Sequence, residues 1–486
     1  SRDGAKKYAE RRIEVSGDEW KKYSFELKPN TSDSAGRLAI RLKEPGSVVI
    51  GHAFLQSGEW GRIKGLPLRR DVVEGLIDQG ITVLRYGGSM VNAPEYRWKK
   101  MIGPRDRRQP YRGTWYPYSS NGWGIIEFLE LCEAAGFLAI PDFNIDETPR
   151  DMADFVEYVN GPGESRWGAK RLADGHRQPY RLKHLELGNE ERVDEKYFQK
   201  FKTLAEAIWG KDPGMILVVG DFVYDRPIRD PMKFDGAASK ITSLAAHQQI
   251  LKLAKEHNAE VWFDVHIDTE GPGVSNSARS LFSYVDALEK LADGAKHHVV
   301  VFEFNANNHE HRRALANAAA LGAIMRDGRI PVVLSANCLQ PDGQNDNGWD
   351  QGLLFLNPSK IWLQPPGYVT QMVSRNYLPR VIEAKVEGGD GKLTVTATRS
   401  EDGKQLVLAV VNSDNLAKKG QVRMDGFLPA KELGEVLELA GPLDARNTAN
   451  ERERIKPKHT AWPHGIKDGS LAYEFAGHSF TVIRFE

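Results

Sequence analysis

The sequence has few cysteines, no excess of charge of either sign and no long apolar run, and each absence excludes a class of protein. Cys132 and Cys338 are the only cysteines among 486 residues, too few for a disulfide framework or a cysteine-ligated zinc site. The 66 basic residues equal the 66 acidic residues, so the composition predicts neither a nucleic-acid partner nor binding to an anionic membrane. No run of about 18 apolar residues predicts a membrane-spanning helix.

Periodicity divides the chain into three regions, 1–47, 48–381 and 382–486. In the first, residues 20–27 and 37–42 alternate between apolar and polar, which predicts β-strands. Two or three strands are too few for a stable sandwich. We therefore expect them to complete a sheet elsewhere or to remain from a truncated module, and the abrupt, charged start suggests a clipped N-terminus without a signal peptide.

The middle region alternates short apolar runs with longer amphipathic stretches, as parallel strands with helical crossovers do. The eight apolar runs are Val48–Phe54, Ile81–Tyr86, Phe137–Phe143, His184–Glu190, Ile216–Phe222, Val261–Ile267, Val299–Asn305 and Val332–Asn337. Helix-like stretches between them are Asp71–Gln79, Ile125–Ala135, Tyr197–Trp209, Ala245–His257 and His311–Arg326. Eight such repeats predict an α/β fold, a (β/α)8 TIM barrel. An open doubly wound sheet is the alternative, but no glycine-rich phosphate-binding motif supports it.

The last region returns to alternation of period two. Residues 392–398, 405–412 and 480–485 alternate, and Asp402-Gly403 supplies a turn signal. This pattern predicts a C-terminal antiparallel β-sandwich, jelly-roll-like, over 382–486.

Polar residues follow the apolar runs where a barrel places its active site, at the C-terminal strand ends. Glu190 ends one of these runs and Glu303 lies two residues before the end of another, while Arg85, Asn189 and His266 stand at or near strand ends. A single glutamate there can equally be a solvated rim residue. Two facing carboxylates suit glycoside hydrolysis, with retention at a separation of about 5–5.5 Å and inversion at a wider one.

These residues resemble a known family. Leu187-Gly188-Asn189-Glu190 is similar to the strand-four Asn-Glu pair of the clan A retaining hydrolases, and the chain resembles glycoside hydrolase family 51 over about residues 48–486. The resemblance also includes the segments 83–88, 102–105, 127–133, 156–162, 175–180, 443–448 and 455–457. It implies a two-glutamate, double-displacement mechanism.

The resemblance also implies a role for each matching residue. Glu190 resembles the acid/base and Glu303 the nucleophile. Asn189 resembles the residue that binds the sugar 2-hydroxyl. Arg85 resembles the arginine that keeps the nucleophile ionised, which agrees with the effect of a guanidinium on a carboxylate pKa. His266 occupies the position of a residue that contacts the nucleophile.

Two departures from typical family members bear on the substrate. Ser89 stands where arabinofuranosidases carry a sugar-binding Asn, and Gln56 where they carry a Glu that grips arabinose. Aromatic loop residues, among them Trp115, Trp123 and Trp349, suit stacking on sugar rings, although each can equally be a packing residue. We therefore expect an endo-β-1,4-glucanase (cellulase) acting on plant cell-wall polysaccharide. The alternatives are an α-L-arabinofuranosidase on arabinoxylan or arabinan and a non-catalytic carbohydrate-binding protein.

The expected partner is a polysaccharide or oligosaccharide, with no cofactor and no metal. His309-Glu310-His311, with His297 and His298, fits no standard zinc motif. We expect a secreted or extracellular protein, or a cytoplasmic one if it is an arabinofuranosidase. In this scheme residues 1–47 are sandwich-associated strands or a truncated carbohydrate-binding module.

Overall fold

Among the residues that the structure describes, seven short parallel strands form the central sheet, in the order in which they occur along the chain. They are β1 (Val83–Tyr86), β2 (Leu138–Phe143), β3 (His184–Leu187), β4 (Ile216–Gly220), β5 (Glu260–Asp268), β6 (Lys296–Asn305) and β7 (Val333–Ser335). This computed structural model describes residues 1–486 except 116–117, 223, 237–238, 271–273 and 344–349. The sheet curls so that β1 and β7 approach each other, which gives a nearly closed barrel and confirms the predicted fold class.

The first predicted barrel strand is wrong. Residues 48–54 form no strand; they belong to a separate compact unit, residues 1–55, that contains no helix or strand. An apolar run becomes a strand only where a neighbouring strand satisfies its backbone groups, and residues 1–55 have no ladder partner in the described structure. For the same reason the alternating stretches 20–27 and 37–42 remain extended chain.

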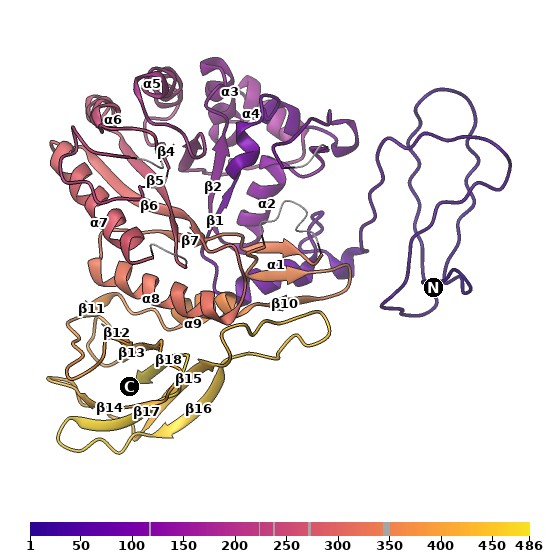
Figure 1. Cartoon of the computed structure of the whole chain (residues 1–486). Coiled ribbons are helices and arrows are strands. Elements are labelled where there is room, and N and C mark those ends of the chain that lie inside the picture. Colours follow the sequence, from indigo (N-terminus) through magenta and orange to yellow (C-terminus); the bar gives the residue numbers. More distant parts are fainter. Residues whose placement is uncertain (116–117, 223, 237–238, 271–273, 344–349) are drawn as a thin grey trace. The chain divides into compact units, whose positions relative to one another are not determined.

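Helices follow the strands and cover the outside of the barrel (Figure 1). They are α1 (Arg70–Asp78), α2 (Ile125–Ala135), α3 (Pro149–Asn160), α4 (Arg166–Ala173), α5 (Glu195–Trp209), α6 (Ala245–Glu256), α7 (Val274–Leu291), α8 (His311–Asp327) and α9 (Pro365–Arg375). Short 3-10 turns lie at Glu59–Gly61, Gly88–Asn92, Trp98–Met101 and Arg105–Arg107. Side chains of Thr148, Ser165 and Asp194 cap the starts of α3, α4 and α5 by accepting backbone N–H bonds. None of the described helices is long and apolar enough to cross a membrane.

The side chains inside the barrel are apolar in one part and become polar at the C-terminal strand ends. Ile140, Val218, Trp262, Val300 and Phe302 are buried and pack together inside the sheet. Polar and charged side chains occupy the C-terminal strand ends instead, and that is where the candidate site lies. A small three-stranded sheet follows the barrel, with β8 (Leu339–Pro341), β9 (Leu354–Leu356) and β10 (Ile361–Leu363) in the order β10-β9-β8.

The chain ends in two antiparallel sheets, which confirms the predicted sandwich. One has six strands in the order β11-β12-β13-β18-β15-β16, and the other pairs β14 with β17. The strands are β11 (Arg380–Ile382), β12 (Leu393–Arg399), β13 (Leu406–Asn412), β14 (Lys418–Arg423), β15 (Leu433–Ala440), β16 (Lys458–Pro463), β17 (Ser470–Phe475) and β18 (Ser479–Phe485). Apolar residues of α8 and α9 share a core with β13, β15 and β18, so the sandwich packs directly against the barrel helices.

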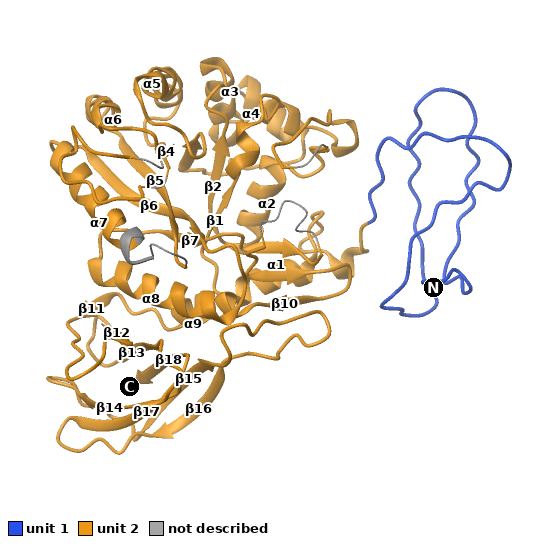
Figure 2. Cartoon of the chain, in the orientation of Figure 1, with its two compact units in different colours: residues 1–55 blue, residues 56–486 orange. Residues whose placement is uncertain are grey.

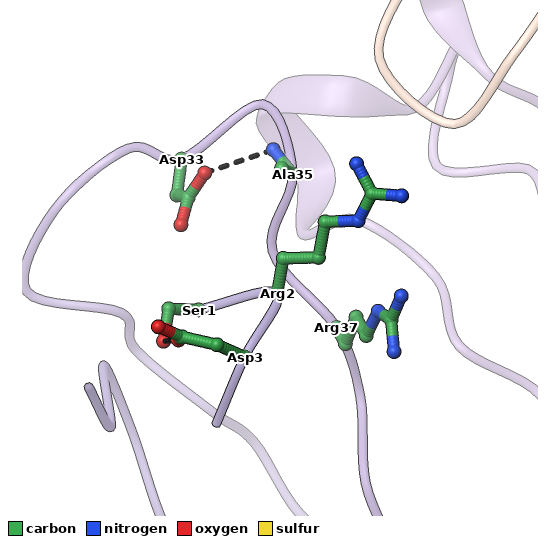
Figure 3. A pocket seen from close by; sticks show the side chains of 6 residues that line it. All are labelled: Ser1, Arg2, Asp3, Asp33, Ala35 and Arg37. Carbon is green, nitrogen blue, oxygen red and sulfur yellow. Dashed lines mark hydrogen bonds between the residues drawn. The ribbon is translucent and has the colours of Figure 1, made fainter. Parts of the chain in front are cut away.

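Residues 1–55 form a unit of their own (Figure 2). Within this unit a hollow is lined by Ser1, Arg2, Asp3, Asp33, Ala35 and Arg37 (Figure 3). The Asp33 carboxylate accepts a hydrogen bond from the Ala35 backbone N–H at 2.8 Å, a local turn contact. The paired glutamates Glu190 and Glu303 belong to the other unit, residues 56–486.

Candidate active site

The structure brings together five of the predicted site residues at the C-terminal end of the barrel. Arg85 lies on β1, Asn189 and Glu190 follow β3, His266 lies on β5 and Glu303 on β6. Arg85 Nη1 is 3.1 Å from Glu303 Oε1, and Arg85 Nη2 donates to Asn189 Oδ1 at 2.7 Å. His266 Nδ1 lies 3.0 Å from Glu190 Oε1. One oxygen of each glutamate and a nitrogen of His266 all lie within 4.8 Å of one another.

The turn after β3 holds Glu190 in an unusual backbone conformation. Its φ is 52°, in the left-handed region that costs an ordinary residue about 1–2 kcal/mol. The turn is fixed on both sides, because Gly188 N donates to Phe143 O at 2.8 Å and Glu191 N donates to Gly220 O at 2.9 Å. A Cβ on Gly220 would stand 1.7 Å from the Gly188 carbonyl oxygen, so only glycine permits this approach of β4.

Three buried carboxylates that the sequence analysis did not single out surround the Arg85 guanidinium. Glu186 accepts two hydrogen bonds from Arg85, from Nε and from Nη2, the second at 2.8 Å. Asp142 Oδ2 and Asp264 Oδ2 lie 3.3 Å and 3.9 Å from Arg85 Nη2. All three carboxyl side chains are completely buried.

This crowding of charge shifts the pKa values of the group. Burial and the Asp264 charge raise the pKa of Glu186 to about 8, although Arg85 opposes the shift. Burial and the Glu186 charge raise the pKa of Asp142 well above its usual range. Burial alone would lower the pKa of Arg85, but the carboxylates outweigh it and raise that pKa, so the guanidinium stays charged.

A sequence signal for these carboxylates exists. Asp142, Glu186 and Asp264 each interrupt an apolar run. Side chains two residues apart in a strand share a face, so Asp264 lies on the same face as His266. Acidic residues inside otherwise apolar barrel strands, in phase with strand-end polar residues, would have pointed to the interior beneath the site.

Opposing effects determine the ionisation of Glu303 and His266. Burial would raise the pKa of Glu303, but His266 and Arg85 outweigh it and lower that pKa below the usual glutamate value. Burial would lower the pKa of His266, yet Glu303 and Asp264 raise it well above the usual histidine value. His266 Nε2 lies 3.0 Å from Asp264 Oδ2, so the Asp264 carboxylate stabilises the protonated ring through this nitrogen. Glu303 is therefore a carboxylate at neutral pH.

The other predicted site residues are Ser89, Gln56 and three tryptophans, and not all of them belong to the cluster around Glu303. The backbone oxygen of Ser89 accepts a hydrogen bond from Thr114 Oγ1 at 2.6 Å, so the Ser89 turn is tied to the loop that carries Trp115. Trp115 and Trp123 are both partly exposed. Gln56 is exposed at the start of the second unit. Trp349 lies outside the described residues.

The histidine-rich segment does not gather around one point. His309 Nδ1 faces Asp350 Oδ1 at 3.0 Å, whereas His311 Nε2 hydrogen-bonds the His478 carbonyl oxygen at 2.7 Å. Among the described residues, the one group with metal-ligand spacing is Glu190, His266 and Glu303. Both side chains already have partners in the protein, because Arg85 Nη1 lies 3.1 Å from Glu303 Oε1 and His266 Nε2 lies 3.0 Å from Asp264 Oδ2.

Comparison with known proteins adds relatives to this geometry. The family model described as "Alpha-L-arabinofuranosidase 1 domain" matches residues 76–267. A probable α-L-arabinofuranosidase C from Aspergillus terreus is 33% identical, and the alignment covers 86% of this chain and 88% of the fungal protein. The chain belongs to glycoside hydrolase family 51.

Other relatives confirm the fold, and one of them is much longer than this chain. The thermostable family 51 α-L-arabinofuranosidase structure from Thermotoga petrophila superposes with a TM-score of 0.71 at 20% identity, covering 86% of this chain and 90% of that one. An extracellular exo-α-L-arabinofuranosidase from Streptomyces chartreusis is 24% identical over 77% of this chain. The chain spans only 46% of that Streptomyces protein.

These findings correct the predicted substrate. The endo-β-1,4-glucanase prediction is wrong, because the family model and the relatives named above are α-L-arabinofuranosidases. The prediction depended on Ser89 and Gln56 as marks of a lost arabinose pocket. Two replaced side chains do not determine the shape of a pocket, because loops from several strands build it in a barrel.

Proposed function

We propose that this chain is a retaining, exo-acting α-L-arabinofuranosidase that releases terminal arabinofuranosyl groups from polysaccharide or oligosaccharide. The observation that carries the proposal is the pair Glu190 and Glu303, with carboxylate oxygens within 4.8 Å of each other. Retaining glycosidases place their carboxyl groups about 5–5.5 Å apart, whereas inverting enzymes need a wider gap for a water molecule. The names of the relatives supply the sugar.

In this proposal Glu303 is the nucleophile and Glu190 the acid/base. The Glu303 carboxylate attacks the anomeric carbon while Glu190 gives its proton to the departing glycosidic oxygen, so a glycosyl ester forms and the aglycone leaves as an alcohol. Glu190, now a carboxylate, takes a proton from water, and that water replaces Glu303 at the anomeric carbon. Two inversions give net retention.

The hydrogen bonds of Arg85 and Asn189 also support this assignment. Arg85 bonds both Glu303 and Asn189, so one guanidinium orients the nucleophile and the amide. Because Asn189 Oδ1 accepts from Arg85, its Nδ2 points elsewhere, and that buried nitrogen has no hydrogen-bond partner. A buried donor without a partner is costly. The family resemblance assigns Asn189 to the sugar 2-hydroxyl, which would give this nitrogen an acceptor.

The test compares substrates and variants. Wild-type protein should release nitrophenol from 4-nitrophenyl α-L-arabinofuranoside and arabinose from arabinoxylan, without lowering the viscosity of the polymer. Glu303→Gln should fold but show no turnover, because an amide cannot form the glycosyl ester. Failure of the wild type to act on any arabinofuranoside would reject the sugar; normal turnover by folded Glu303→Gln would reject the nucleophile.

A further inference from the structure

A second residue on β6 contacts Glu303 and has no part in the mechanism above. Asn305 lies two positions after Glu303, so both side chains leave the strand on the same face. Asn305 Nδ2 donates to Glu303 Oε2 at 3.2 Å, while Arg85 binds the other carboxylate oxygen. Each oxygen of Glu303 therefore has its own donor.

The direction of the Asn305 bond follows from its neighbours. An amide can present either its oxygen or its nitrogen, so its partners must decide. Gln351 Oε1 accepts from the backbone N–H groups of Ala306 and Asn307, at 3.1 and 3.2 Å. Backbone N–H groups only donate, so the Gln351 oxygen must face them and its Nε2 must face Asn305 Oδ1, at 2.8 Å. Asn305 is then obliged to present its nitrogen to Glu303.

Gln351 itself is held rigidly. It is completely buried, and its backbone N donates to Gln340 Oε1 at 3.3 Å. Its carbonyl oxygen accepts from Arg313, a fully buried guanidinium that also donates to the Phe304 carbonyl at 3.0 Å. Gln351 is thereby tied to the end of the strand that carries Glu303.

We propose that Gln351 is a positioning residue for the nucleophile: it sets the direction of a hydrogen-bond chain that passes through Asn305 and ends as a donor to Glu303. A donor to the charged form of a carboxylate favours ionisation and restricts its rotation. Glu303 would thus be held ionised by three groups, Arg85, His266 and the directed amide chain. The role of Glu303 as nucleophile rests on the proposed function, whereas the chain itself does not.

The test measures the ionisation of Glu303 without substrate. The carboxyl carbon of Glu303, labelled with carbon-13 and assigned by its absence in Glu303→Gln, is titrated by NMR. In Gln351→Met, a neutral change of similar length, we expect Glu303 to titrate at a higher pH than in the wild type. Gln364→Met is the matched control, because Gln364 is also buried and bonds the backbone of Asn447, in the sandwich region. In Gln364→Met, Glu303 should titrate at the same pH as in the wild type.

Two further variants separate the proposed role from a general loss of packing. Asn305→Ala should shift the titration in the same direction, and adding Gln351→Met to it should shift it no further, because Gln351 acts through Asn305. Gln351→Leu, which is also neutral and cannot donate to Asn305, serves if Gln351→Met does not fold. An unshifted Glu303 in the folded variant, or an undiminished shift in the Asn305→Ala background, would overturn the inference.

Kinetics give an independent measure. With the nitrophenyl arabinofuranoside, kcat/KM of Gln351→Met should fall about tenfold more on the acid side of its pH profile than on the plateau, the size expected for one charge-assisted hydrogen bond. A uniform fall at all pH values would indicate a structural role and contradict the inference. If the wild type hydrolyses no arabinofuranoside, the proposed function fails, and the NMR titration still decides the inference.

Discussion

Replacing Arg85 with methionine should lower the stability of the protein and also make Glu303 harder to ionise, because one guanidinium pairs with several buried carboxylates. Arg85 bonds Glu186 and Glu303, and Asp142 lies 3.3 Å from it. Removing one partner of a buried ion pair costs about 3–5 kcal/mol, because the remaining charge stays buried and unpaired. At roughly 2 °C for each kcal/mol, Arg85→Met should unfold about 6–10 °C below the wild type.

The loss should depend on pH in a defined direction. Glu186 has a pKa of about 8 in the folded protein, so between its unfolded value and about pH 8 the native state binds more protons than the unfolded state. The contribution of Glu186 to the free energy of unfolding therefore falls as pH rises from its unfolded pKa to about pH 8. Without Arg85 the carboxylates bind protons still more tightly. The difference in melting temperature between variant and wild type should be smaller near pH 5 than near pH 8.

Arg108→Met is the matched control. Arg108 is also buried and makes a two-bond ion pair with Glu127, at 2.8 and 2.7 Å, but it does not contact Glu303. We expect both variants to lose stability in thermal unfolding, but only Arg85→Met to shift the acid limb of kcat/KM to higher pH. A wild-type melting temperature for Arg85→Met, or an unmoved acid limb, would refute the electrostatic role of Arg85.

Three other predictions concern the same strand ends. Glu190→Ala should lose activity on substrates with poor leaving groups, and azide should restore turnover on activated ones as a glycosyl azide of retained configuration; an inverted product would contradict the mechanism. Gly220→Ala should cost about 1–3 kcal/mol of stability and lower kcat, because its Cβ would strike the turn that carries Glu190; unchanged kcat and melting temperature would argue against this close approach. In the wild type, kcat/KM should stay high to pH values below the ordinary glutamate pKa, because the pKa of Glu303 is lowered; a limb above that value would show that the carboxylate is not held ionised.

Much of the barrel was predictable from local pattern. Apolar runs that end in polar residues identified seven strands, and the rule that barrel sites lie at C-terminal strand ends selected Arg85, Glu190 and Glu303. The run at 48–54 failed because apolar character alone does not specify a pairing partner. The phase of an acidic residue inside a strand indicates that it faces the barrel interior, but the pattern does not tell which side chain it contacts there.

The parts of the site that sequence reasoning missed depend on contacts between distant strands. Glu186 becomes the partner of Arg85 only when β3 and β1 meet across the interior, 101 residues apart in sequence. The orientation of Asn305 depends on Gln351, a loop residue that follows no apolar run. The substrate was misjudged at Ser89 and Gln56, because a replaced side chain shows a lost contact but not the contacts that remain.

Trapping the covalent intermediate tests the central claim most directly. Glu190→Ala should form the glycosyl ester from an activated arabinofuranoside faster than it hydrolyses it, so the intermediate should accumulate. Mass spectrometry of the digested protein should then locate one arabinosyl group on Glu303, and on no peptide in the Glu190→Ala/Glu303→Gln double variant. A sugar on another carboxylate, or steady hydrolysis by Glu190→Ala with an inverted product and no adduct, would contradict the assignment of Glu303 as nucleophile.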